Sequence, residues 1–211
     1  MQEAGNTVNP ANLFKQVSSN CTMDSLFRWR RPIMDILMLV LCFILMDLFR
    51  PDLVLLAIYL FLYPYLYLTG RSQWIYRLII SSGMALAWMI LAGGMYQYRV
   101  GMMNLFGMNL FTLLAWALGL YAAYTFFVHL NRIFNIQGTA KRMLLFLSIY
   151  WPMLIIVESI AYHVLLFRNI PTLAYPGLPL CDCIHAPFWM QFAYFAMGPI
   201  YYALCERFAK K

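Results

Sequence analysis

Apolar runs close to the thickness of a lipid bilayer recur along the whole chain. Apolar residues make up 64% of the 211-residue sequence and charged residues only 11%, whereas a soluble domain usually carries about a quarter charged residues. In hydrocarbon every backbone N–H and C=O group needs an internal partner, and runs of roughly 20 residues meet this need as helices. The sequence therefore predicts an all-α fold, a polytopic transmembrane helix bundle.

Six apolar segments are expected to form this bundle. They cover residues 32–49, 53–68, 75–98, 105–130, 143–167 and 186–205. A polar arm, 1–31, precedes the transmembrane domain of residues 32–205, and a basic tail, 206–211, follows it. Residues 10–31 of the arm predict either an amphipathic helix on the inner membrane face or a partly disordered segment.

Lysine and arginine positions set the expected orientation of the helices. With both termini on the cytoplasmic or equivalent inner side, the outer segments hold only Arg50, Arg99 and Arg168 of the 15 basic residues. Inner loops of multi-pass proteins carry such an excess of basic residues. The net charge of +7 then reflects topology, so nucleic acid is not expected as a partner. The expected location is a bacterial inner membrane or an organelle membrane.

Glu158 is the acidic residue placed deepest in an expected helix. It lies about 15 residues into the segment 143–167, which is roughly 23 Å along the helix axis. A carboxyl at such depth usually faces the bundle interior and has a partner or a chemical role. Glu158 and His163 are thus the candidate catalytic pair, and a structural Glu158 that fixes helix packing is the alternative. Asp47 instead predicts an interfacial ion pair with Arg50.

Residues 168–185, here called the long loop, lack helical character and are expected on the outer face. Four residues disfavour both helix and central strand: Pro171, Pro176, Gly177 and Pro179. A loop of this length, in a chain whose other connections are short, is usually functional or binds a partner.

The long loop ends in Cys181-x-Cys183-x-His185. Alternate residues of an extended segment point to one side, so two thiolates and an imidazole are placed to bind zinc or copper. The same spacing is compatible with a disulfide or with two free cysteines. A haem held by His163 and His185, both expected near the outer surface, is a further possibility.

Small residues form a stripe on the expected helix 105–130. Ala115, Gly119 and Ala123 follow small-xxx-small spacing, which predicts close packing against another helix of the bundle or of a partner. A weak internal similarity would correspond to an inverted three-plus-three repeat. It matches Leu55-Leu56 to Pro64 with Leu144-Leu145 to Pro152, and Met84, Ala87, Trp88 and Tyr96 with Met190, Ala193, Tyr194 and Tyr202.

No P-loop, dinucleotide fingerprint, HExxH motif or nucleophile elbow occurs in the sequence. With the short connections and the proline-rich long loop, this favours a subunit or scaffold of a larger membrane complex. Its expected partners are membrane lipids and other membrane subunits or further copies of itself. The alternatives are a membrane-embedded enzyme or metal- or haem-binding redox protein near the outer leaflet, and a small transporter built on the repeat.

Overall fold

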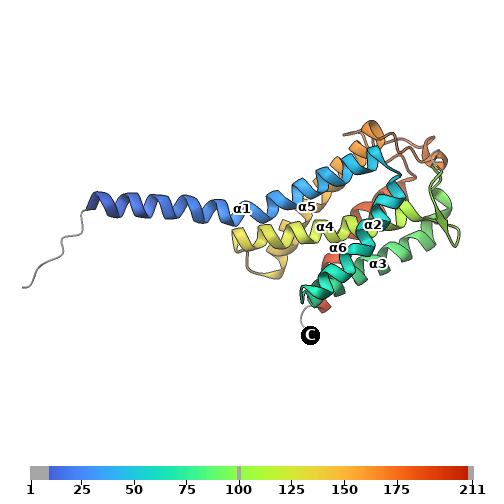
Figure 1. The fold of residues 1–211 in the computed structure, drawn as a ribbon. Helices are drawn as coiled ribbons and strands as arrows, with labels where there is room; N and C mark the ends of the chain where they lie inside the picture. Colours follow the sequence, from blue (N-terminus) through green and yellow to red (C-terminus); the bar gives the residue numbers. More distant parts are fainter. Residues whose placement is uncertain (1–9, 99–100, 209–211) are drawn as a thin grey trace, which may run out of the picture.

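The computed structural model describes the backbone of residues 10–98 and 101–208, and side chains from residue 29 onward within those ranges. This part of the chain is mostly helical. Its helices are α1 (Pro10–Leu48), α2 (Pro51–Leu68), α3 (Ser72–Ala92), α4 (Leu110–Phe134), α5 (Thr139–Ser159) and α6 (Phe188–Phe208). Figure 1 shows them gathered into one bundle, with the N-terminal part of α1 extending beyond it. The predicted all-α class is confirmed.

Four segments of the described chain are long and apolar enough to cross a membrane. They are α2, α3, α4 and the segment Thr139–Val164, which contains α5. These segments support the prediction of a membrane protein with several apolar helices, because a run of about 20 such residues spans the hydrocarbon core. The number of spans and the side on which the termini lie stay predictions.

Both ends of the connection between α3 and α4 differ from the sequence prediction. The helix predicted over 75–98 ends at Ala92, because Gly93 and Gly94 follow and form the 3-10 turn η1 (Gly93–Met95); glycine is a poor helix former. A hairpin of β1 (Asn104–Leu105) and β2 (Met108–Asn109) then precedes α4. Asn109 caps α4, since its side chain accepts a 3.1 Å hydrogen bond from the N–H of Thr112.

The bounds of α1 and α5 also differ from those of the segments expected from the sequence. α1 begins at Pro10, so residues 10–31 share one helix with residues 32–48; the placement of 10–31 on a membrane face stays a prediction. α5 changes at Ser159 into a π-helix, η2 (Ile160–Val164). The long loop contains the 3-10 turn η3 (Ile170–Thr172) and returns the chain to α6.

Asp52 fixes the junction between α1, α2 and the β-hairpin. Its buried carboxylate accepts 2.8 Å hydrogen bonds from the Arg50 guanidinium and from the N–H of Met103. The carboxylate also lies in the first turn of α2, where the helix dipole favours negative charge. The predicted pairing of Arg50 with Asp47 is therefore wrong, because Arg50 bonds to Asp52 while Asp47 is exposed.

α4 is the central helix of the bundle and contacts all five other α-helices. Around it lies an aromatic core whose rings meet at centroid distances of 5.3–6.3 Å; its members are Tyr124, Phe127, Phe146, Tyr201 and Tyr202. These side chains are almost fully buried. Edge-on and tilted rings of this kind add to the stabilisation from burial, so this core holds α4, α5 and α6 together.

Candidate functional site

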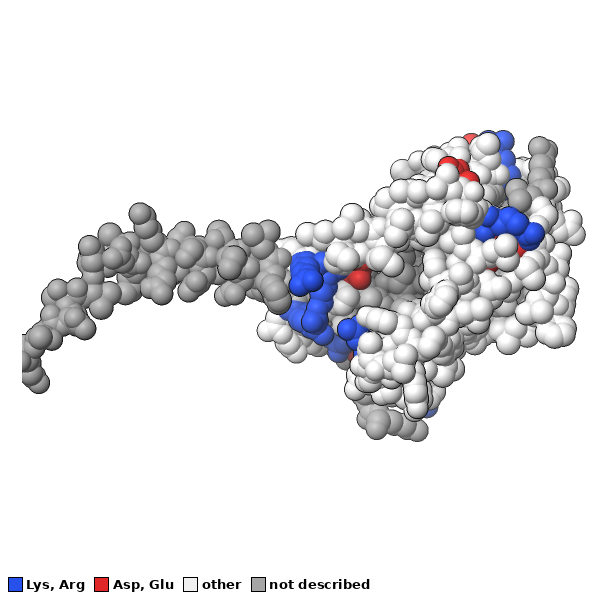
Figure 2. All heavy atoms as spheres, in the orientation of Figure 1, with Lys and Arg blue, Asp and Glu red and all other residues white. Residues whose placement is uncertain are grey.

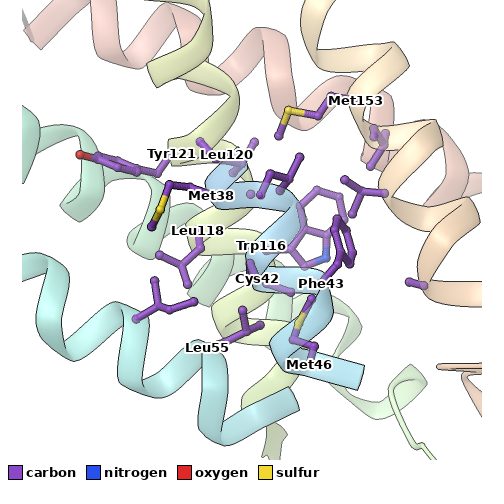
Figure 3. Close-up of a pocket in the computed structure, with 18 of the residues that line it drawn as sticks. Met38, Cys42, Phe43, Met46, Leu55, Trp116, Leu118, Leu120, Tyr121 and Met153 are labelled. Atoms are coloured by element: carbon purple, nitrogen blue, oxygen red, sulfur yellow. The ribbon is translucent and has the colours of Figure 1, made fainter. Parts of the chain in front are cut away.

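A cavity of about 1590 Å³ lies between α1, α2, α4 and α5. Figure 3 shows side chains from these helices converging on it. Its wall is mostly apolar, with contributions from Met38, Cys42, Met46, Leu55, Leu118 and Met153. The space-filling view in Figure 2 shows the same face hollowed between α1 and α2. The cavity reaches from arginines near one end of the bundle to the long loop at the other.

The small-residue stripe lies on the wall of this cavity. Ala115 and Gly119 line it, and a Cβ atom added to Gly119 would meet nothing within 4 Å. Ala123 alone is fully buried in the core. Close packing of a second helix of the bundle at Gly119 is therefore not seen in the described part of the chain, and packing of a partner helix there stays a prediction.

α5 and α6 approach each other tightly at Gly198 of α6, which the sequence did not single out. A Cβ atom added there would lie 2.2 Å from Cδ1 of Tyr150 on α5. Such a distance is far inside van der Waals contact, so α5 and α6 can pack in this way only around a glycine.

Glu158 lines the cavity from α5, in agreement with the expectation that it faces the bundle interior. It precedes by two residues the π-helix η2, and π-helical turns occur frequently at functional sites. Its carboxyl makes no hydrogen bond or ion pair within the part of the chain that the structure describes. A carboxyl without a protein partner in an apolar wall is available to a polar group of a ligand.

His185 also lines the cavity, next to Tyr162 at the long-loop end. The two rings stack with centroids 4.5 Å apart. His185 Nδ1 lies 2.8 Å from the carbonyl oxygen of Tyr175, and its Nε2 lies 3.1 Å from that of Asp182. These contacts hold the imidazole inside the folded long loop, so His185 has a structural task there.

His163 lies outside the set of cavity-lining residues. Its ring is exposed, and Nε2 lies 3.0 Å from the carbonyl oxygen of Cys181. The structure therefore places only Glu158 of the predicted catalytic pair on the cavity. A haem held by His163 and His185 does not fit, because three of their four ring nitrogens lie at hydrogen-bonding distance from backbone carbonyls.

The predicted zinc or copper site at Cys181, Cys183 and His185 is not formed. Cys181 and Cys183 are joined in a disulfide, which is one of the alternatives that the sequence left open. Metal binding uses thiolates, and a disulfide supplies none. Among the side chains that the structure describes, no cluster of three His, Cys, Asp or Glu residues is arranged to hold a metal ion.

A buried chain of hydrogen bonds supports the cavity wall near the long loop. Trp88 Nε1 donates to the hydroxyl of Tyr96 over 2.8 Å, and that hydroxyl lies 2.7 Å from the hydroxyl of Tyr194. Tyr96 and Tyr194 both line the cavity. Burial raises the pKa of Tyr96, so the phenol stays neutral. Sequence reasoning missed these residues because a tyrosine in an aromatic-rich chain carries no distinguishing signal.

The fold and the cavity define a helical membrane protein with an open, mostly apolar cavity, and Glu158 is an unpartnered carboxyl among the described residues of its wall. Comparison of the chain with models of known protein families, with curated proteins and with solved structures finds no match.

Proposed function

We propose that the protein is a multi-pass membrane protein that binds an amphiphilic, lipid-soluble ligand in its cavity. The observation that carries this proposal is the apolar cavity of about 1590 Å³ into which Glu158 brings a carboxyl without a protein partner. Ligand sites are mostly apolar, measure roughly 300–1,000 Å³ and contain a few polar groups that orient the ligand. This cavity is larger, as a ligand with a long hydrocarbon chain requires.

The position of the cavity suits a ligand that arrives through the membrane. Met38 of α1 and Phe61 of α2 line the cavity and are 60% and 74% exposed, so the cavity is open beside them. Because these exposed side chains are apolar, we infer that the opening of the cavity faces the lipid. A hydrocarbon chain can thus pass between α1 and α2 without crossing water.

Glu158 is the proposed polar contact of the ligand. Its side chain is half-buried in the cavity wall, and a hydroxyl or N–H group of the ligand would donate a hydrogen bond to the carboxylate. Glu158→Leu would remove that contact, whereas Glu158→Gln keeps an acceptor oxygen at the same place.

Filling the cavity is expected to abolish ligand binding. A leucine at position 119 would project into open space, where it would overlap a bound chain, so we expect Gly119→Leu to lower the amount of retained lipid about tenfold. The measurement is native mass spectrometry of the detergent-purified protein after incubation with a dioleoyl phospholipid.

The matched control for this experiment is Gly83→Leu. Gly83 is exposed on α3, an added Cβ there also meets nothing within 4 Å, and the residue does not line the cavity. This variant should retain lipid like the wild type. Equal retention by the wild type and both variants would show that the lipid binds elsewhere, and the proposed function would be wrong.

Six spans with both termini inside are the topology that we propose for this function. A cysteine introduced for Leu180, which is 82% exposed in the long loop, should react with a membrane-impermeant maleimide in intact cells. A cysteine introduced for Gln137, exposed between α4 and α5, should react only after the cells are opened. The reverse pattern would contradict the orientation.

The functions predicted from sequence stay predictions beside this proposal. Docking as a complex subunit would place a partner helix against Gly119, which borders the cavity and meets no neighbouring helix of this chain. An enzyme acting on the bound ligand is favoured by Glu158 beside the π-helix. The transporter reading depends on the repeat, which pairs Tyr96, beyond the end of α3, with Tyr202 inside α6.

A further inference from the structure

Four arginines line one end of the cavity, here called the arginine end. They come from three separate parts of the fold: Arg30 and Arg31 from α1, Arg71 from the turn between α2 and α3, and Arg132 from the last turn of α4. Figure 2 shows Lys and Arg side chains gathered at one end of the hollow. Their convergence at one cavity is a property of the fold, since they are far apart in the sequence.

These arginines are available to an anionic ligand. Arg30, Arg31 and Arg132 form no ion pair with a carboxylate in the described part of the chain, and Arg71 donates to the hydroxyl of Tyr65 over 3.2 Å. Only two carboxyl groups line the cavity, from Asp35 and Glu158.

The two carboxyl groups do not balance the four arginines, because Asp35, one turn from Arg31 on α1, offsets one positive charge at most. Asp35 is bonded to Nδ1 of His129, and Glu158 lies on α5, toward the π-helix and the long loop. The arginine end therefore carries an excess of positive charge directly beside the apolar wall. A ligand that uses both features needs a negative head and a hydrocarbon body.

Topology alone does not explain this arrangement. Lys141 and Arg207 are basic residues at the same end of the bundle, and they satisfy the same bias of charge across the membrane without lining the cavity. The arginines at the cavity therefore differ from other basic residues in position. Arginine is also the side chain best suited to a phosphate, because its planar fork donates two parallel hydrogen bonds.

We propose that the cavity selects a membrane lipid with a net-negative phosphate headgroup. This inference rests on the proposed function and specifies its ligand: the phosphate lies among Arg30, Arg31, Arg71 and Arg132, and the hydrocarbon chain follows the apolar wall past Met38 and Cys42. Basic pockets between membrane helices bind anionic headgroups in this way.

Competition between two lipids with identical chains tests this proposal. The purified protein is incubated with equal amounts of dioleoyl phosphatidic acid and dioleoyl phosphatidylcholine, and the retained lipids are counted by native mass spectrometry. We expect the wild type to prefer phosphatidic acid about tenfold, because the arginines attract its net-negative headgroup more strongly than the zwitterionic headgroup of phosphatidylcholine. The double variant Arg30→Gln with Arg132→Gln should reduce this preference to about twofold.

The matched control is the double variant Lys141→Gln with Arg207→Gln, which removes the same charge from the same end outside the cavity. It should keep the wild-type preference, and an equal loss in both double variants would overturn the proposal by showing a diffuse effect of surface charge. Equal retention of the two lipids by the wild type would overturn the headgroup assignment. If the wild type retained both lipids equally and Gly119→Leu removed both, the proposed lipid-binding function would stand, and only the headgroup assignment would fall.

Discussion

Replacing Gly198 with alanine is expected to lower the free energy of unfolding by about 3 kcal/mol, at the upper end of the usual cost of overpacking a core. The added Cβ would lie 2.2 Å from Cδ1 and 2.4 Å from Cε1 of Tyr150. The Tyr150 ring cannot yield, because it is buried, stacks on Phe146 at 5.8 Å, and donates a 2.6 Å hydrogen bond to the carbonyl oxygen of Tyr194.

Thermal denaturation in detergent, followed by circular dichroism, measures this effect. Gly119→Ala is the control, because it makes the same chemical change on α4 where an added Cβ meets nothing within 4 Å. Alanine has the higher helix propensity, so this control should be as stable as the wild type or slightly more stable. A Gly198→Ala variant with an unchanged Tm would mean that α5 and α6 do not approach each other at this glycine.

Replacing Glu206 with leucine is expected to cost about 2 kcal/mol. Oε1 of Glu206 accepts hydrogen bonds from the Tyr124 hydroxyl over 2.8 Å and from Nη2 of Arg142 over 2.9 Å, and so joins α6 to α4 and α5. Removing one member of a buried ion pair leaves its partner uncompensated and costs about 3–5 kcal/mol. The expected cost of Glu206→Leu is lower than this range because the Arg142 and Glu206 side chains are 32% and 15% exposed.

A double-mutant cycle separates the ion pair from the loss of packing. Arg142→Leu together with Glu206→Leu should be more stable than Glu206→Leu alone, because the double variant leaves no unpaired guanidinium. Arg207→Leu, at an exposed neighbouring residue, should change the Tm little. Additive effects of the two single substitutions would contradict the coupling between Glu206 and Arg142.

The helical class could be predicted from sequence because it depends on local composition. The apolar segments 53–68 and 105–130 overlap α2 and α4, since hydrocarbon length and backbone hydrogen bonding fix a helix without knowledge of its neighbours. The depth of Glu158 likewise indicated an inward position. The end of α3 at Ala92 was missed, because the apolar run to residue 98 outweighed the helix-breaking pair Gly93-Gly94.

The cavity could not be predicted, because it depends on distances between helices. Small residues such as Ala115 and Gly119 permit close packing but do not require it, and the sequence does not show which occurs. The approach of Gly198 to Tyr150 depends in the same way on how α5 and α6 cross.

The predictions for the junction of α1 and α2 and for the end of the long loop were wrong for a more local reason. Arg50 has two acidic neighbours, Asp47 and Asp52, and only the fold shows that Asp52 is buried beside the N–H of Met103. The spacing of Cys181 and Cys183 was compatible with both a metal site and a disulfide, and oxidation decides between them.

The central claim, a lipid-binding cavity between α1, α2, α4 and α5, is tested most directly by an experimental structure of the protein in lipid nanodiscs containing phosphatidic acid. The account predicts elongated density that begins among the arginines of the arginine end, follows the wall past Gly119 and reaches toward Glu158. A structure in which α1 packs directly on Gly119, leaving no cavity and no such density, would contradict it.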